Sequence, residues 1–328
     1  MNRQELQDAI AFLFEPGAVI GLELYLVLNT EDGTQIRKAD LGDGNLPNEV
    51  KNGFIAYING RTNENVDAQV LPLSELNPER TTIHHYDFED LPDGLDIINT
   101  ELNPEEIETF NFDDDNLEDV DAFLIKLSSV DNHVVLYKKH YHLNLLKQST
   151  VFYFVKDDER FAKPEEGILR FSFSIDFMKV NDEIIVYNVK CLEKEFAFDN
   201  ILINNAQQKV IAITQLNFVD NIEELTALAG DKSGARKVLS IKSTSPVLQL
   251  EFDQIKTFVQ NHPYLRRRLR FNDDESRFHF HTQVSRLYFI DLLNDNFLTS
   301  DLTSIFYKTN LKDEMADEAG EEDDEQDA

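Results

Sequence analysis

The apolar residues of this chain follow different spacings in its two halves, and this change constrains the fold more than any other feature. In the first half, apolar runs are separated by short polar turns. Glu31-Asp32-Gly33 joins residues 22–29 to 34–39, and Val130-Asp131-Asn132 joins residues 122–128 to 133–138. Each pair is typical of a hairpin. The first half is therefore predicted to consist mainly of antiparallel strands.

Helical spacing flanks these strands. Leu6, Ile10 and Leu13 recur at helical intervals near the start, and a second helix is predicted to begin around Pro47. Two later strands are expected at residues 168–176 and 183–189.

In the second half, helical spacing dominates. Asp220 is a candidate N-cap for a helix that ends at Gly230. Residues 266–271 fit either a helix or a strand. Three further helix faces are predicted from apolar residues three or four positions apart: Ala206, Val210 and Ile213; Phe252, Ile255 and Val259; Leu287, Ile290 and Leu293.

These patterns predict an α+β protein with an N-terminal antiparallel strand-rich part, flanking helices and a C-terminal helix-rich part. We expect a strand-rich domain over residues 1–145, a helix-rich α+β domain over residues 146–312 and a disordered acidic tail over residues 313–328.

The lack of long apolar runs and the single cysteine indicate where in the cell this chain is expected. No apolar run reaches the roughly 18 residues that a membrane-spanning helix needs, and the first residues are too polar for a signal peptide. Cys191 is the only cysteine, so an internal disulfide or a thiolate zinc cage cannot form. We therefore expect a cytoplasmic protein.

The negative charge is concentrated in two places. The acidic stretch, residues 81–125, contains fifteen Asp and Glu and no Lys or Arg. The acidic segment, residues 313–328, has ten acidic residues among sixteen and no basic one. Together they hold 25 of the 31 net negative charges, so the remainder of the chain is almost neutral. The acidic segment is either a solvating tail or a DNA mimic that folds back over a basic surface.

Basic residues gather in the second half of the chain. Residues 231–270 contain nine Lys and Arg and only three acids. If Leu265 and Leu269 bury one side of a helix, the arginines between them cover its other faces and fit phosphate oxygens. The alternative is that they neutralise acidic stretches of this chain or of a partner. The candidate DNA-binding residues are Lys232, Arg236, Lys237, Lys242, Arg266, Arg267, Arg268, Arg270, Arg277 and Arg286.

No catalytic motif emerges, and no catalytic residue, metal or cofactor is assigned. Asp176, Asp182 and the triplet Asn188-Val189-Lys190 resemble the acid pattern of metal-dependent nucleases, but an amide stands where the triplet needs an acid. Two histidine pairs, His140 with His142 and His279 with His281, could form half of a zinc site. Neither pair has an obvious third ligand, so exposed or ion-paired histidines are expected.

Two stretches of the chain resemble the KwaB family, the soluble subunits of two-component Kiwa anti-phage systems. The first is residues 182–188 with 192–196, and the second is residues 292–303 with Tyr307 and Lys312. The resemblance implies an effector that binds phage DNA, self-associates as a homodimer and is recruited to the inner membrane face by a membrane-spanning KwaA-like subunit. It also implies a block of phage replication and late transcription. It does not identify DNA-contacting residues.

The predicted function is therefore non-specific DNA binding through the basic residues, by an anti-phage effector that works with a membrane partner. Two alternatives stay open. One is an adaptor that never touches DNA and docks through the acidic stretch. The other is a metal-dependent nuclease around Asp176, Asp182 and Lys190.

Overall fold

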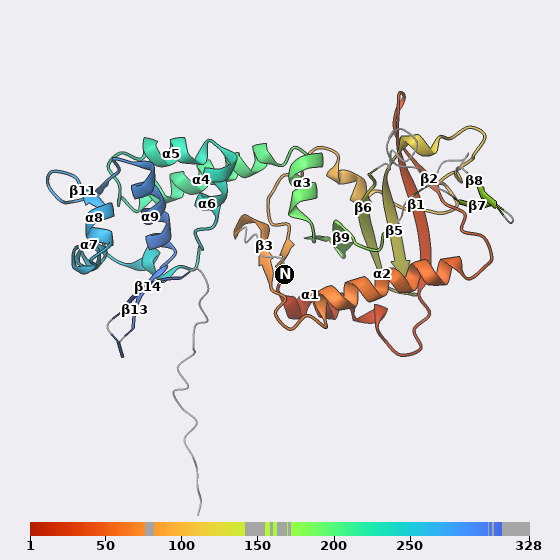
Figure 1. Ribbon diagram of the computed structural model, residues 1–328, viewed down its shortest axis with the longest axis horizontal. Coiled ribbons are helices and arrows are strands. Elements are labelled where there is room, and N and C mark those ends of the chain that lie inside the picture. The colour runs from red at the N-terminus through yellow and green to blue at the C-terminus, as the bar shows by residue number, and fades with distance from the viewer. Residues whose placement is uncertain are drawn as a thin grey trace, which may run out of the picture. The chain divides into compact units, whose positions relative to one another are not determined.

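The computed structural model describes residues 1–75, 82–141, 155–157, 160–162, 169, 172–300, 302–303 and 305–309. The chain divides into two compact units, Met1–Asn205 and Ala206–Ala328, which we call the sheet unit and the helical unit. Figure 1 shows strands confined mainly to the first and helices dominating the second, so the predicted α+β class is confirmed.

An eight-stranded sheet organises the sheet unit, in the order β2-β1-β5-β6-β9-β10-β4-β3. Neighbouring strands are antiparallel except β3 and β4, which are parallel. Both predicted hairpins are confirmed as β1–β2 and β5–β6. The strands are β1 (Gly21–Thr30), β2 (Gly33–Lys38), β3 (Val70–Pro72), β4 (Ile83–His85), β5 (Val120–Ser128), β6 (His133–Lys139), β9 (Phe177–Val180) and β10 (Glu183–Val186).

Two helices pack on one face of this sheet and close the core. Leu6 and Ile10 of α1 (Arg3–Ile10) are fully buried, as the predicted helix face requires, and so are Phe54 and Ile58 of α2 (Leu46–Thr62). They join a single apolar cluster with alternate residues of β1, because side chains two apart in a strand share a face. The other elements described here are α3 (Val189–Glu195), η1 (Ala11–Leu13), η2 (Leu73–Glu75), η3 (Leu95–Asn99), η4 (Leu117–Asp119) and a separate pair, β7 (Val155–Asp157) with β8 (Arg160–Ala162).

The expected domain boundary at residues 145 and 146 falls inside the sheet unit. β9 pairs with β6, and β10 joins β9 to β4, so strands on both sides of that position complete one sheet. The predicted strand over residues 168–176 is wrong for residues 172–176. The strand begins at Phe177 instead, which lies opposite Tyr137, while Asp176 turns its side chain to the end of β6. Residues 163–168, 170 and 171 lie outside the described residues.

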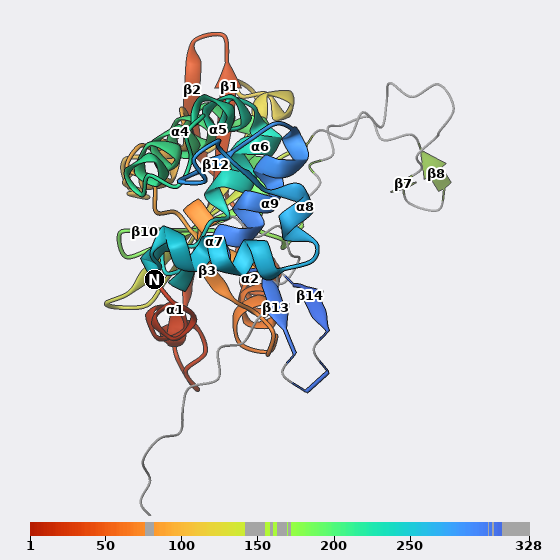
Figure 2. The ribbon, with the colours of Figure 1, turned by 90° about the vertical axis from the view of Figure 1, so that its left-hand side faces the viewer.

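The helical unit is built around α9 (Gln283–Leu293). This helix contacts α5 (Glu223–Ala229), α6 (Lys232–Leu239) and α8 (Leu265–Arg268), and both views place it between α6 and α8 (Figures 1 and 2). Phe278 and Phe289 are fully buried in the core of the helical unit. The unit also contains the last part of α4 (Asp199–Gln215), η5 (Pro246–Gln249), α7 (Phe252–Asn261) and the hairpins β11 (Arg270–Phe271) with β12 (Phe278–His279) and β13 (Phe297–Thr299) with β14 (Phe306–Lys308).

The predicted helices of this unit are confirmed, with one local correction. Gly230 ends α5 as expected, but the N-cap position is Ile222 and not Asp220. The carboxylate of Asp220 instead lies 2.8 Å from Nδ1 of His279, where a long-range partner replaces the local capping bond. The acidic tail predicted for residues 313–328 lies outside the described residues.

Candidate nucleic-acid interface

Four arginines of the helical unit lie together on α8 and at the start of β11. We call Arg266, Arg267, Arg268 and Arg270 the arginine cluster. The side chains of Leu265 and Leu269 are buried, at 0% and 2% exposure, while all four arginines are exposed. The prediction that two leucines anchor this segment and turn its arginines outward is confirmed.

The local sequence explains both the shortness of α8 and the exposure of its arginines. Pro263 cannot continue α7, and the ring of His262 accepts hydrogen bonds at Nδ1 from the backbone N–H groups of Tyr264 and Leu265. After one turn the backbone becomes extended at Leu269 and enters β11. Residues 266–271 therefore form both a helix and a strand, which resolves the ambiguity of the sequence.

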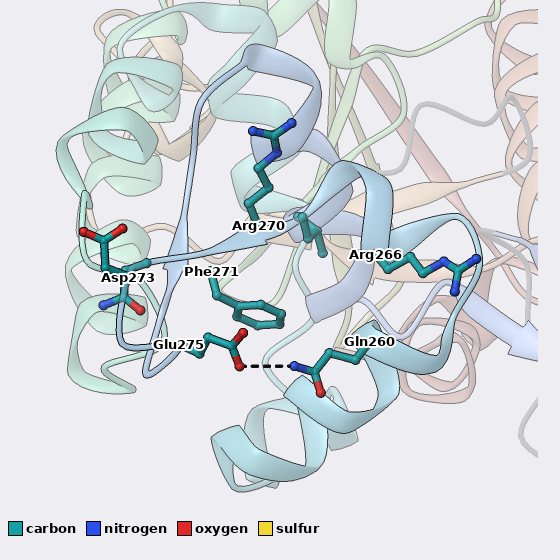
Figure 3. Close-up of a pocket in the computed structure, with 8 residues that line it drawn as sticks. Gln260, Arg266, Arg270, Phe271, Asp273 and Glu275 are labelled. Atoms are coloured by element: carbon teal, nitrogen blue, oxygen red, sulfur yellow. Dashed lines mark hydrogen bonds between the residues drawn. The ribbon is translucent and has the colours of Figure 1, made fainter.

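Beside the cluster is a hollow of about 400 Å³, lined by Arg266, Arg270, Phe271, Gln260 and Glu275, together with Leu269, Asn272 and Asp273. Figure 3 shows the Phe271 ring inside it and the two arginines at its edge, with their guanidinium groups pointing away from Glu275. The cations thus face outward, where a phosphate oxygen could reach them.

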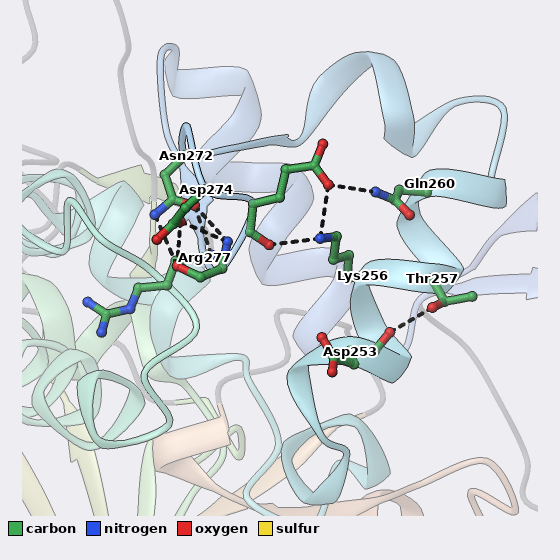
Figure 4. A network of polar contacts seen from close by, with 9 residues as sticks. Asp253, Lys256, Thr257, Gln260, Asn272, Asp274 and Arg277 are labelled. Carbon is green, nitrogen blue, oxygen red and sulfur yellow. Dashed lines mark hydrogen bonds and ion pairs between the residues drawn. The ribbon is translucent and has the colours of Figure 1, made fainter.

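One of the two acids that line this hollow already has partners. Glu275 lies 2.9 Å from Nζ of Lys256 and accepts a hydrogen bond from Gln260 (Figure 4). Within the part of the chain that the structure describes, Arg266, Arg267 and Arg270 form no ion pair. Their charge is available to a partner.

Arg268 is held differently. Its guanidinium carbon lies 5.6 Å from the centre of the Tyr288 ring on α9, a cation–π contact that fixes the outer edge of α8 against the neighbouring helix. The same ring has a second cation, Nζ of Lys308 on β14, at 5.4 Å. This arrangement could not be predicted from the sequence, because no spacing rule connects residues 268, 288 and 308.

The turn between β11 and β12 orders Arg277. Asn272 accepts hydrogen bonds at Oδ1 from the backbone N–H groups of Ser276 and Arg277, and Ser276 also donates to Asp274. The hydrogen bonds that Ser276 donates to Asp274 lower the pKa of the Asp274 carboxyl below its usual value. The Arg277 side chain is half-buried and points away from this network (Figure 4).

A second basic group lies on and after α6. Lys232 and Arg236 are half-buried, whereas Lys237 and Lys242 are exposed. The helix sits close to α5 because residue 234 is glycine: a Cβ there would lie 1.8 Å from the carbonyl oxygen of Leu228. α9 contacts both α6 and α8 and lies between them, and we therefore treat this group as separate from the arginine cluster.

Arg286 does not share the open position of the cluster. Its Nη1 donates to Glu224 Oε2 at 2.8 Å and to the backbone carbonyl of Glu224 at 3.1 Å, which ties α9 to α5. Its side chain is 18% exposed. The charge of Arg286 is used within the fold, so we leave it out of the proposed interface.

The nuclease-like residues of the sheet unit do not converge. Asp176 precedes β9, whereas Asp182 lies in the turn at the other end of that four-residue strand, about 16 Å away at the rise of a β-strand. Asp176 is buried and accepts hydrogen bonds from Lys139 N and from Asn188 Nδ2, with Lys138 Nζ at 3.3 Å. Lys190 is exposed on α3. Asn188 thus supports Asp176 within the fold.

His279 matches the expectation of an exposed or ion-paired histidine, whereas His140 is not exposed: it is buried, and its ring centre lies 5.3 Å from that of Phe123. His279 is paired with Asp220, and its ring contacts that of His281 at 4.6 Å. His142 lies outside the described residues. Among the residues that the structure covers, no three His, Cys, Asp or Glu side chains converge as metal ligands. Over the same residues, every helix is too short or too polar to cross a bilayer.

Comparison with known proteins identifies the family. The family model for Kiwa protein KwaB-like proteins matches residues 117–303, more than half of the chain, so the chain belongs to this family. The matched residues begin at η4, include the arginine cluster and end after β13. One relative is the Kiwa protein KwaB of Escherichia coli O55:H7 (strain RM12579 / EPEC), 28% identical over 323 residues that cover 96% of this chain and 99% of that protein. No solved structure matches.

Proposed function

We propose that this chain binds the DNA backbone through the arginine cluster and thereby acts as the effector of a Kiwa anti-phage system. The observation that carries the proposal is the exposure of Arg266, Arg267 and Arg270 on two buried leucines, without an ion pair in the described residues. Guanidinium groups pair with phosphate oxygens through two parallel hydrogen bonds, so a fixed group of arginines suits a nucleic-acid backbone.

The large negative charge of the chain is compatible with this function. At physiological salt, charges separated by more than about 8 Å are largely screened, so DNA close to the cluster experiences mainly the nearby arginines. α8 has four residues and is only about 6 Å long, too short to lay a row of side chains along a major groove. We therefore expect binding with little sequence preference.

Membership of the family makes the chain a component of a Kiwa anti-phage defence system. We propose that it acts as a cytoplasmic homodimer that a membrane-spanning KwaA-like subunit recruits to the inner face of the cell membrane. DNA held there by the arginine cluster would be less accessible to polymerases, which accounts for a block of phage replication and late transcription. This mechanism requires no catalytic step, metal or cofactor.

The test is fluorescence anisotropy of the full chain with labelled duplexes of two unrelated sequences, titrated at several salt concentrations. Saturable binding to both duplexes with similar affinity, weakening steeply as salt increases, supports the proposal. Absence of binding to either duplex at low salt contradicts it.

An adaptor function has its own supporting observation. Most acids of the acidic stretch are exposed, while Asp115 and Glu108 pair with Arg37 of β2 and hold part of the stretch against the sheet unit. Such a fixed acidic surface could dock on a basic face of the membrane subunit. Changing Glu105, Glu106, Asp113 and Asp114 to their amides should then abolish co-purification of the two subunits and leave DNA binding unchanged. Unchanged co-purification would rule out this surface.

A further inference from the structure

We infer that the acidic segment of this chain, residues 313–328, binds the arginine cluster of the same molecule and competes with DNA for it. The inference concerns the regulation of the proposed DNA-binding surface and so rests on the proposed function. Three observations support it: the place where the described chain ends, the exposed arginines near that place that form no ion pair with the described residues, and the composition of the acidic segment.

The described chain ends beside the arginine cluster. Lys308 on β14 lies 5.4 Å from the Tyr288 ring, and Arg268 lies 5.6 Å from the same ring, so the two cations are no farther apart than the sum of these distances. The backbone N–H of Thr309 donates to the carbonyl oxygen of Asn296, which fixes the last described residue to the helical unit. The described chain therefore ends close to α8.

The connection to the first acid is short. Only residues 310–312 separate Thr309 from Asp313, and three extended residues span about 10 Å. From Asp313 onward, ten of sixteen residues are acidic and none is basic. A segment tethered this closely has an effective concentration of roughly millimolar at the cluster, so even a weak contact is populated.

The surface at this point can accept such a segment. Arg266, Arg267 and Arg270 form no ion pair with any residue that the structure covers, and two neighbouring acids are engaged: Asp291 with Lys308 and Glu275 with Lys256. Carboxylates, like phosphate oxygens, bind guanidinium groups through two parallel hydrogen bonds. The acidic segment and the DNA backbone thus present the same chemistry to the same arginines.

The competition has a predictable size. A tethered competitor lowers apparent DNA affinity by the factor one plus the ratio of its effective concentration to its dissociation constant. For a local contact with a dissociation constant of roughly 0.1 to 0.5 mM, the factor is about threefold to tenfold. Because the competitor belongs to the same molecule, the factor should not depend on protein concentration.

The contact itself is tested without DNA. A fluorescent peptide with the sequence of residues 313–328 is titrated with a chain that ends at Lys312. We expect saturable, salt-sensitive binding that is lost when Arg266, Arg267 and Arg268 are changed to Ala. A control with Lys190 and Lys194, two exposed lysines of α3, changed to Ala should retain it. Equal binding by both variants, or none by the parent, overturns the inference.

The regulation is tested with duplex DNA and three chains: the full chain, the chain that ends at Lys312, and a full-length chain whose ten acids in residues 313–328 are replaced by amides. The last two should bind DNA about threefold to tenfold more tightly than the first at low salt, and the difference should shrink as salt rises. Three equal affinities overturn the inference while leaving the proposed function intact. Peptide binding without any DNA binding retains the contact and contradicts the proposed function.

Discussion

The two units of this protein use charge in opposite ways. In the sheet unit, Asp176 is almost completely buried among Lys138, Lys139 and Asn188, and Lys139 also bridges Asp121 at 2.7 Å and Glu195 at 3.4 Å. In the helical unit, three arginines on one short segment are exposed and form no ion pair with the described residues. Charge that is buried and paired maintains a fold, whereas charge that the fold leaves open is available to a partner.

This contrast has a structural origin. The sheet places side chains of β6 next to the residues that precede β9 and follow β10, so opposite charges meet within the core layer. α8 makes one turn and is anchored by two leucines, and Arg266, Arg267 and Arg270 form no ion pair with the described residues. The contrast therefore predicts large stability effects for paired charges and binding effects for open ones.

The largest stability effect is expected for Asp176→Asn. The amide cannot accept hydrogen bonds from Lys138, Lys139 and Asn188 together and leaves a buried cation without its counter-charge. The free energy of unfolding of the sheet unit should fall by about 3 kcal/mol in denaturant titrations. Asp182→Asn, in the exposed turn of the same hairpin, is the matched control and should change it by less than about 0.5 kcal/mol. Equal effects at the two sites would show that Asp176 is not the centre of a buried network.

A smaller stability effect is expected for Gly234→Ala, which tests the close packing of α6, the helix of the second basic group, against α5. The new Cβ would lie 1.8 Å from the carbonyl oxygen of Leu228, so α6 must move away from α5. Overpacking of this kind costs about 2 kcal/mol. Gly44, which has open space around its Cβ position, provides the control, since Gly44→Ala should be close to neutral. A stable Gly234→Ala variant would contradict the close approach of the two helices.

The smallest effects compare two arginines of the helical unit. Arg286→Ala should lower the free energy of unfolding by about 1 kcal/mol, because it removes the bond to Glu224, and should leave DNA affinity unchanged. Arg267→Ala should do the reverse, with stability unchanged and DNA affinity reduced about fivefold through loss of one phosphate contact. Denaturant titrations of both variants measure the change in stability, and fluorescence anisotropy measures the change in DNA affinity. A loss of affinity in Arg286→Ala alone would reverse the assignment.

Local sequence was sufficient for much of the fold and for the centre of the candidate site. The turns at Gly33 and Asp131 identified both long hairpins, and Leu265 and Leu269 correctly predicted which side of α8 is buried. Features that depend on distant residues were inaccessible. Neither the bond from Arg286 to Glu224 nor the extension of the sheet past residue 145 can be read from spacing, because partners roughly 40 to 60 positions apart meet only after folding.

DNA binding through the arginine cluster is tested by the salt dependence of the affinity of three chains: the parent, the Arg266→Ala, Arg267→Ala, Arg268→Ala triple variant, and the Lys190→Ala, Lys194→Ala control. We expect the triple variant to remain folded, to bind DNA about 100-fold more weakly at low salt and to have a slope of log affinity against log salt that is smaller by about 2 to 3. The control should match the parent. A folded triple variant with the affinity and slope of the parent would contradict the arginine cluster as the DNA-binding surface.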